Sequence, residues 1–240
     1  MNYRFILIFA WFYGYSFLRR GYTYVFTYLI NPLAILFLVY VLSRGELLSY
    51  AVVGGMISVV ATNAVVSLSD VVMLRKEMKI QDMLVASEVT PLDYMLGLAT
   101  ANYVFSVPGV IAYVIMGLLL GVLTPASSVE IVLVSTFLNY VISGLAFFIG
   151  TLVPYTRHSW AVSGVLSTIL TVFPPVYYPF AVLSPELREI VLILPSASAS
   201  ALSQWVTGLY QFDPLSLLAL IVECLIFFTI SLKISKWREE

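Results

Sequence analysis

The sequence predicts an all-α integral membrane protein with six transmembrane helices. Hydrophobic residues make up 61% of the 240 residues and charged residues only 10%, whereas soluble domains carry about 45–50% and about 25%. The mean hydropathy is +0.99. Runs without Asp, Glu, Lys or Arg recur at lengths near the roughly 20 residues that a helix needs to cross a bilayer. These observations exclude a soluble enzyme, a nucleic-acid-binding protein and a disordered protein.

The net charge and the small number of cysteine and histidine residues exclude further classes of function. The net charge is −1, so no basic excess favours a polyanionic partner such as nucleic acid. Cys224 is the single cysteine and His158 the single histidine, which excludes an intrachain disulfide and the two-histidine metal motifs. We expect no metal site and no cofactor on this chain.

The N-terminal segment, residues 1–20, is predicted to be an interfacial helix. The apolar run Phe5–Leu18 would be about 21 Å long as a helix, too short to cross a membrane. Arg4 and the pair Arg19-Arg20 bracket it, and it is rich in Tyr, Phe and Trp, which favour the headgroup level. We therefore expect this helix to lie along the membrane surface.

The spans are assigned from the remaining apolar runs. Residues Ile190–Phe212 also lack charge, but their many serines are too polar for lipid and suit a re-entrant or interfacial segment buried against protein. We therefore expect an external re-entrant segment over residues 183–213. The six predicted spans are Tyr22–Leu42, Leu48–Leu68, Leu92–Leu120, Ile131–Val153, Ser159–Phe180 and Pro214–Leu232.

The distribution of Lys and Arg supports six spans with both termini in the cytoplasm. Only Arg44 and Arg188 then lie outside, and a seventh span would move the cations after Pro214 outside as well. The positive-inside rule favours the first arrangement. We expect a multi-pass protein of the cell membrane, with these cations inside: Arg4, Arg19, Arg20, Arg75, Lys76, Lys79, Arg157, Lys233, Lys236 and Arg238.

A charged segment, residues 70–90, follows the second predicted span. Arg75, Lys79 and Asp82 are spaced i, i+4 and i+7 and would share one face of a helix. Apolar residues recur at helical spacing among them, which predicts a short amphipathic cytoplasmic helix that ends near Ser87. Two interpretations stay open: a solvated loop, or a helix that docks on a cytoplasmic partner and transmits its motion.

The third span is predicted to begin with a capping box. Thr90 would be the N-cap, Pro91 the first helical residue, and the Asp93 carboxylate would reach back to the cap. The chain therefore breaks after the amphipathic helix and starts a new helix.

The run Leu74–Gly97 resembles the segment after the second span in membrane subunits of type-2 ABC exporters. That family shows an Arg-Glu pair, a Leu-rich turn and a Thr-Pro or Ser-Pro break before the third span. The matching residues are Arg75 with Glu77, Met83 with Leu84, and Thr90 with Pro91; Lys76 and Asp82 depart from the pattern.

Two later stretches extend the resemblance over nearly the whole chain. Phe173–Pro179 is similar to the proline-aromatic end of the family's fifth span. Leu183–Arg188 and Leu194-Pro195 resemble its external re-entrant hairpin before the last span.

The resemblance implies that residues 1–240 form one permease domain of an ATP-driven exporter for an amphipathic or hydrophobic solute. It implies a second permease copy or close paralogue and separate cytoplasmic ATPase subunits. This chain has no GxxxxGK[ST] phosphate loop, so ATP and Mg are expected on the ATPase partner. The residues implied in ATPase docking are Arg75, Glu77, Lys79, Asp82, Met83, Leu84, Thr90 and Pro91.

Polar residues inside the predicted spans are candidates for a solute path. Glu223 lies in the middle of the last span, either as a proton, cation or solute site or as a protonated acid bonded to a neighbouring helix. The asparagines favour interhelical hydrogen bonds, with a lining role as the alternative. The full set of candidate path or gate residues is Asn31, Asn63, Asn139, Tyr177, Tyr178 and Glu223.

Three rival functions follow from the same residues. Glu223 could drive a proton-coupled secondary transporter or a channel. A membrane enzyme would need clustered catalytic side chains, which the sequence does not show. A scaffold for another complex would carry no solute.

Overall fold

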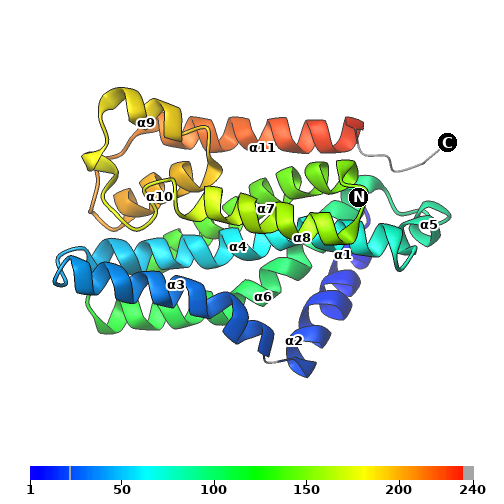
Figure 1. Cartoon of the computed structure of the whole chain (residues 1–240), viewed down its shortest axis with the longest axis horizontal. Helices are drawn as coiled ribbons and strands as arrows, with labels where there is room; N and C mark the ends of the chain where they lie inside the picture. Colours follow the sequence, from blue (N-terminus) through cyan, green and yellow to red (C-terminus); the bar gives the residue numbers. More distant parts are fainter. Residues whose placement is uncertain (22, 235–240) are drawn as a thin grey trace.

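A computed structural model describes residues 1–21 and 23–234, and every regular element in these ranges is a helix (Figure 1). The elements are α1 (Tyr3–Phe9), the π-helical η1 (Ala10–Tyr15), α2 (Ser16–Arg20), α3 (Thr23–Leu42), α4 (Leu48–Lys76), α5 (Ile80–Val85), α6 (Pro91–Leu119), α7 (Pro125–Leu152), α8 (Thr156–Thr171), η2 (Phe180–Val182), α9 (Pro185–Val191), α10 (Pro195–Val206) and α11 (Pro214–Ile234).

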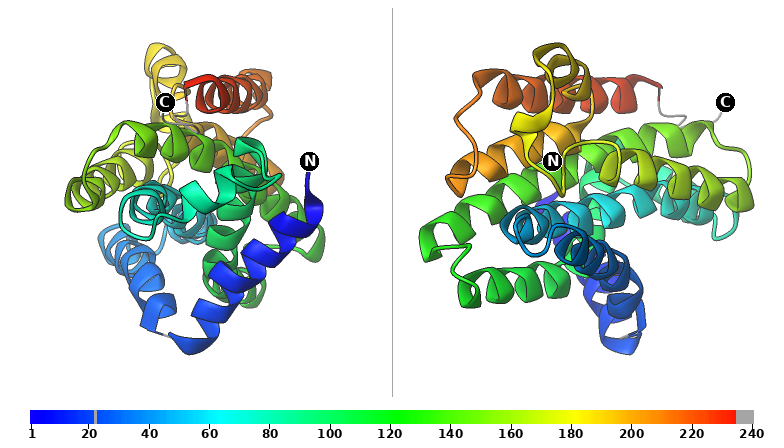
Figure 2. Two further views of the ribbon diagram at one scale, coloured as in Figure 1. Left: turned by 90° about the vertical axis from the view of Figure 1, so that its right-hand side faces the viewer. Right: turned by 60° about the vertical axis from the view of Figure 1, so that its left-hand side comes forward.

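Helix α4 is the central helix of the bundle, and it packs against α3, α6, α7 and α8. Figure 2 shows the neighbouring helices grouped around it. Residues 51–61 are all buried, so its apolar side chains have no preferred outer face. Gly54 permits one close approach, because a Cβ there would collide with the backbone of Val176.

Four helices are long and apolar enough to cross a membrane among the described residues: α4, α6, α7 and α11. They correspond to the second, third, fourth and sixth predicted spans. Helices α3 and α8 occupy the places of the first and fifth spans. The described part of α3 includes a shorter apolar helix, Leu29–Leu42, and α8 has 16 residues, about 24 Å at 1.5 Å per residue. The six-span count stays a prediction.

Three predicted boundaries are wrong. Helix α4 continues through residues 70–76, so the connecting segment is shorter than 70–90. Helix α7 begins at Pro125 because Thr124 caps it, whereas the fourth span was predicted to begin at Ile131. Helix α8 ends at Thr171, not at Phe180, because Pro174 and Pro175 that follow cannot continue a helix.

The polar segment after α9 is buried, as expected for a helix packed against protein. Every residue of 195–204 in α10 is buried. The Gln204 side chain accepts a hydrogen bond from the Phe180 N–H at 2.9 Å and donates to the Pro175 and Tyr178 carbonyls, both at 3.1 Å. Ser200 donates to the Pro175 carbonyl at 2.7 Å. Gln204 and Ser200 of α10 therefore satisfy backbone groups of the proline-rich segment.

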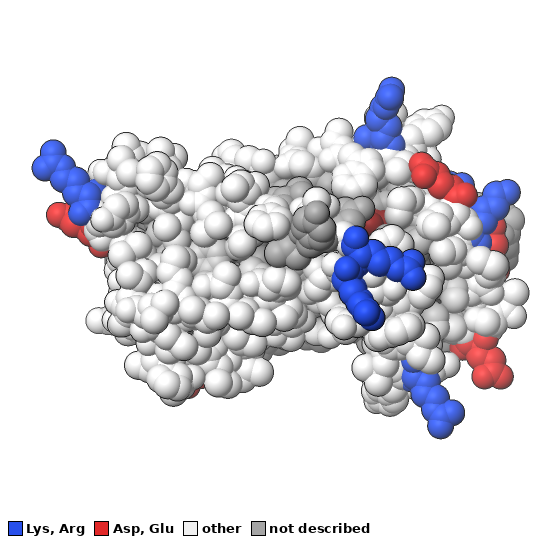
Figure 3. Space-filling model, turned by 90° about the horizontal axis from the view of Figure 1, so that it is seen from below, with Lys and Arg blue, Asp and Glu red and all other residues white. Residues whose placement is uncertain are grey.

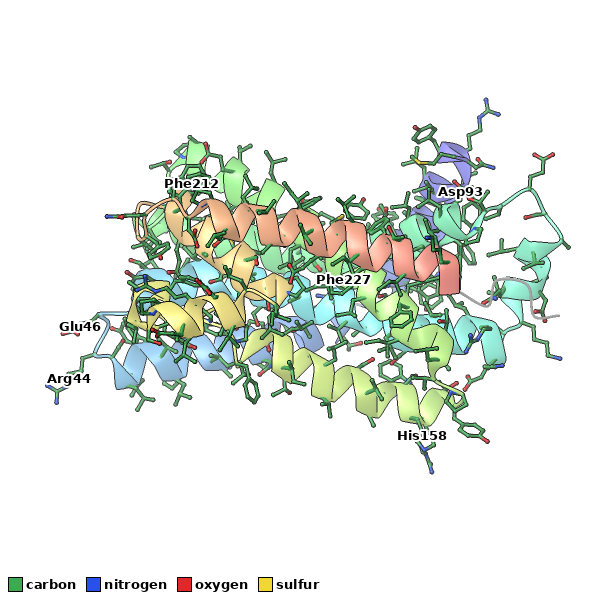
Figure 4. The ribbon with its side chains drawn as sticks, turned by 90° about the horizontal axis from the view of Figure 1, so that it is seen from above. Arg44, Glu46, Asp93, His158, Phe212 and Phe227 are labelled. Atoms are coloured by element: carbon green, nitrogen blue, oxygen red, sulfur yellow. The ribbon has the colours of Figure 1, made fainter. Side chains whose placement is uncertain are left out.

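Charged side chains lie mainly toward the two ends of the molecule. Figure 3 shows a broad uncharged surface between them on one face. Arg44 and Glu46 mark one end in Figure 4, whereas Asp93 and His158 mark the other. An uncharged belt between two charged ends is the pattern of a membrane-spanning bundle.

The N-terminal segment is helical from Tyr3 to Arg20, with the π-helical turn in its middle. It runs across the long axis of the bundle (Figure 1). Leu7, Ile8 and Trp11 are exposed, while Phe9 and Gly14 are buried against α6. One apolar face thus remains uncovered, as a helix in the membrane surface requires.

Candidate functional site

The predicted docking segment lies at the end of the bundle opposite Arg44, between α4 and α6 (Figures 1 and 4). The backbone of Lys79 is left-handed, with φ 51°, and α5 begins only at Ile80. Arg75 belongs to α4, whereas Asp82 belongs to α5. The expectation that Arg75, Lys79 and Asp82 share one helical face is therefore wrong.

Arg75 points into the protein. Its side chain is 7% exposed. One guanidinium nitrogen donates to the Thr151 carbonyl at 2.9 Å, and another donates to the Gly150 and Val153 carbonyls at 3.3 and 3.2 Å. These carbonyls end α7, where helical partners are missing and a cation is favourable. Arg75 was expected to contact an ATPase, but its burial leaves it out of the docking set that we retain.

The outer face of the segment carries charged side chains and two methionines, whereas apolar side chains of its inner face pack on the bundle. Ile80 and Leu84 pack on a core cluster that includes Phe9, Leu74 and Tyr94. This packing fixes α5 to the bundle. Among the residues implied in docking, Glu77, Lys79, Asp82, Met83 and Thr90 are exposed, and Leu84 and Pro91 are half-buried.

The predicted capping box at the start of α6 is confirmed. The Asp93 carboxylate accepts hydrogen bonds from the Thr90 N–H at 3.1 Å and from the Thr90 hydroxyl at 2.7 Å. The Thr90 hydroxyl oxygen accepts one from the Asp93 N–H at 3.2 Å. Asp93 is 1% exposed, whereas its partner Thr90 is exposed, so the capping box lies at the surface of the bundle.

Asp93 also joins the N-terminal helix to this corner, a contact that sequence reasoning missed. Its second carboxylate oxygen accepts a hydrogen bond from the Asn2 N–H at 2.6 Å. The Asn2 side chain in turn caps α1 by accepting from the Phe5 N–H. One buried carboxylate therefore connects α1, the end of the docking segment and α6.

Aromatic packing continues the connection into the bundle. The Phe9 and Tyr94 rings meet edge to face at 5.8 Å between centroids, and Tyr94 meets Phe147 of α7 at the same distance. A Cβ on Gly14 would lie 2.8 Å from the Ala101 carbonyl oxygen, so η1 and α6 touch backbone to backbone. The N-terminal helix, α5 and the ends of α4, α6 and α7 thus form one packed unit, which we call the coupling corner.

The asparagines predicted for a solute path lie on different helices. Asn31 is exposed on α3. The buried Asn63 amide donates to the Val59 carbonyl of its own helix, and the buried Asn139 amide donates to the Ala99 carbonyl of α6 at 3.0 Å. Asn139 therefore makes the interhelical bond that its position favoured. A role in a solute path stays a prediction for all three.

The other candidate path residues lie nearer α10 and α11. Tyr177 is buried and Tyr178 half-buried in the segment that α10 holds. Glu223 is 8% exposed, and neither carboxylate oxygen has a hydrogen-bond partner among the described residues. Their part in a path or gate also stays a prediction.

The uncharged belt, the long apolar helices and the coupling corner define a helical membrane protein with a short, partly exposed helix, α5, at one end. Groups of His, Cys, Asp and Glu suited to a metal are absent from the described residues. The family model for ABC-2 type transporters matches residues 5–206, and the chain belongs to that family. No curated protein sequence matches the chain. The resemblance to type-2 ABC permeases is confirmed, and the chain is a transport permease of the membrane.

Proposed function

We propose that this permease is the membrane subunit of an ATP-driven exporter, powered by separate ATPase subunits that contact α5 and the turn up to Thr90. The coupling corner supports the proposal. Met83 is 64% exposed on the outer face of α5, while Ile80 and Leu84 fix the inner face to the bundle. A helix exposed on one side and packed on the other can transmit a push as a rigid body.

Motion at α5 would reach several helices together. The Asp93 carboxylate links the turn after α5 to the first residues of α1, and the cluster around Tyr94 includes residues of α4, α6 and α7. Closely packed interiors move as units and do not deform continuously. ATP-driven closure of the partner subunits would therefore displace the N-terminal helix and the helix ends together.

The remaining features of the proposal follow the family pattern. Two permease copies, or this chain and a close paralogue, would enclose the solute path. Both termini would lie in the cytoplasm of a cell-membrane protein with six spans and an external re-entrant α9–α10 hairpin. ATP and Mg would bind the ATPase subunits, and an amphipathic or hydrophobic solute would leave outward.

Site-specific photo-crosslinking tests the ATPase contact. A photoreactive amino acid replaces Met83 on α5 in one sample, and Leu187 in exposed α9 in the control. After illumination of the native cells, mass spectrometry identifies the proteins bound to each. We expect an ATPase subunit at Met83 and none at Leu187. Equal recovery at both positions, or transport by the purified permease without an ATPase, would contradict the proposal.

A proton-coupled transporter remains a second candidate because Glu223 is buried without a hydrogen-bond partner among the described residues. A carboxyl group at membrane depth is a typical proton-relay group. If the protein is a proton-coupled transporter, Glu223→Gln or a proton ionophore should stop solute flux. The flux should persist when ATP is depleted and the proton gradient is maintained. If the protein is an ATP-driven exporter, ATP depletion alone should stop the solute flux.

A further inference from the structure

A cavity of about 390 Å³ lies beside the coupling corner. The N-terminal helix, α4, α6 and α8 contribute its walls, including Phe12, Phe105 and Trp160. Met78, which precedes α5, and Ile80, its first residue, line the cavity as well. Its volume falls within the roughly 300–1,000 Å³ of small-molecule pockets. Phe12 and Trp160 are exposed, so the cavity has a rim open to the surroundings.

One carboxylate, Asp70 of α4, lies in this otherwise largely apolar wall. Asp70 is 7% exposed. One oxygen accepts a hydrogen bond from the Tyr13 hydroxyl at 3.0 Å, and the other accepts from the Asn102 amide at 3.1 Å. Both donors are neutral. The next cation along α4, Arg75, bonds the end of α7 instead.

The arrangement around Asp70 favours a positively charged ligand. An ionised carboxylate can accept about four hydrogen bonds, so two neutral donors leave capacity for more. Burying a charge is costly unless a counter-charge or further hydrogen bonds compensate. A protonated amine supplies both, and aromatic faces such as those of Phe12, Phe105 and Trp160 attract cations. An anionic ligand would instead meet a like charge.

We propose that this cavity binds a freely diffusing monocationic amphiphile, with its ammonium group on Asp70 and its apolar body against the aromatic walls. The binding itself does not require the proposed function; only the ligand's role as exported solute rests on it. Because Met78 and Ile80 line the same cavity, an occupied site would touch the segment proposed to receive ATPase motion.

Two fluorescent probes of matched shape test the charge requirement. The full chain is purified into phosphatidylcholine nanodiscs without any ATPase and titrated with dansylcadaverine, a primary amine, and with its neutral N-acetyl derivative. We expect saturable binding of the amine at least roughly tenfold tighter than that of the acetylated probe, since a charge-assisted hydrogen bond is lost. Equal affinities would overturn the proposal.

Variants assign the effect to Asp70. Asp70→Asn should lower the preference for the amine to about twofold or less, whereas Glu130→Gln, which removes an exposed carboxylate from α7, should keep it. A merely structural role of Asp70 would not alter selectivity between two probes. Full selectivity in folded Asp70→Asn would overturn the proposal.

A second variant covers the case in which Asp70→Asn does not fold. Val66→Phe should fill part of the cavity and weaken both probes together, because Val66 lines it; unchanged binding would overturn the proposal. Displacement of the probe by added phosphatidylethanolamine would also overturn it, by showing that a zwitterionic lipid occupies the site. Since no ATPase is present, failure here is distinct from failure of the crosslinking test.

Discussion

Replacing Asp93 by alanine should loosen the first residues of α1 from the start of α6. The substitution removes the acceptor for the Thr90 N–H, the Thr90 hydroxyl and the Asn2 N–H. Loss of a cap typically costs about 0.5–2 kcal/mol, and loss of a hydrogen bond to a charged group about 1.5–3 kcal/mol. Because the Thr90 hydroxyl keeps its bond from the residue 93 N–H, we expect a total of about 2–4 kcal/mol.

The chain offers a matched control at the other end of the bundle. Thr124 and Ser127 form the same capping box at the start of α7, where the Ser127 hydroxyl accepts from the Thr124 N–H at 2.9 Å. Ser127→Ala should lower the free energy of unfolding by about 1 kcal/mol. It should leave the N-terminal helix in place, because the side-chain hydrogen bonds of Ser127 all lie within its own turn.

Two measurements separate the variants. Unfolding in mixed SDS micelles gives the free-energy losses, and hydrogen exchange of the peptide covering residues 1–9 reports the N-terminal helix. We expect faster exchange in Asp93→Ala only. With ATPase subunits present, the same variant should transport less solute per ATP hydrolysed. If this peptide exchanges equally fast in Asp93→Ala, Ser127→Ala and the wild type, Asp93 does not hold the N-terminal helix in place.

Three further substitutions test the packing. Gly14→Val should push η1 off α6 through the Ala101 carbonyl oxygen, costing about 1–3 kcal/mol, and should speed proteolysis after Arg19. Gln204→Leu should leave the Phe180 N–H without its acceptor, costing about 1–3 kcal/mol, and should lower the Tm. Arg75→Met should leave the last α7 carbonyls unbonded, costing about 1–3 kcal/mol in mixed-micelle unfolding, without abolishing the Met83 crosslink.

Each of these substitutions has a control in the chain. Gly164→Val adds the same side chain where a Cβ meets nothing within 4 Å. Thr207→Val removes bonds that reach only its own helix. Arg157→Met removes an exposed cation. Stability losses no larger in the test variants than in these controls would contradict the packing described above.

Local features were predictable from the sequence because they depend only on residues that lie close together in the chain. Thr90 and Asp93 are three residues apart, so the capping box needs no other part of the chain. Pro174 and Pro175 end a helix by their own covalent structure. The serines of α10 indicated burial against protein because lipid offers them no hydrogen bonds. The order of such local features along the chain also pointed to the family.

Only the tertiary structure decided the contacts between distant residues. The bond from the Asn2 N–H to Asp93 spans 91 residues of sequence, and that from Tyr13 to Asp70 spans 57. The sequence suggests that Arg75 is an exposed cation, but packing of α4 on α7 places it against carbonyls 75 to 78 residues away. Sequence spacing fixes which face of a helix a residue occupies, whereas helix packing decides what that face meets.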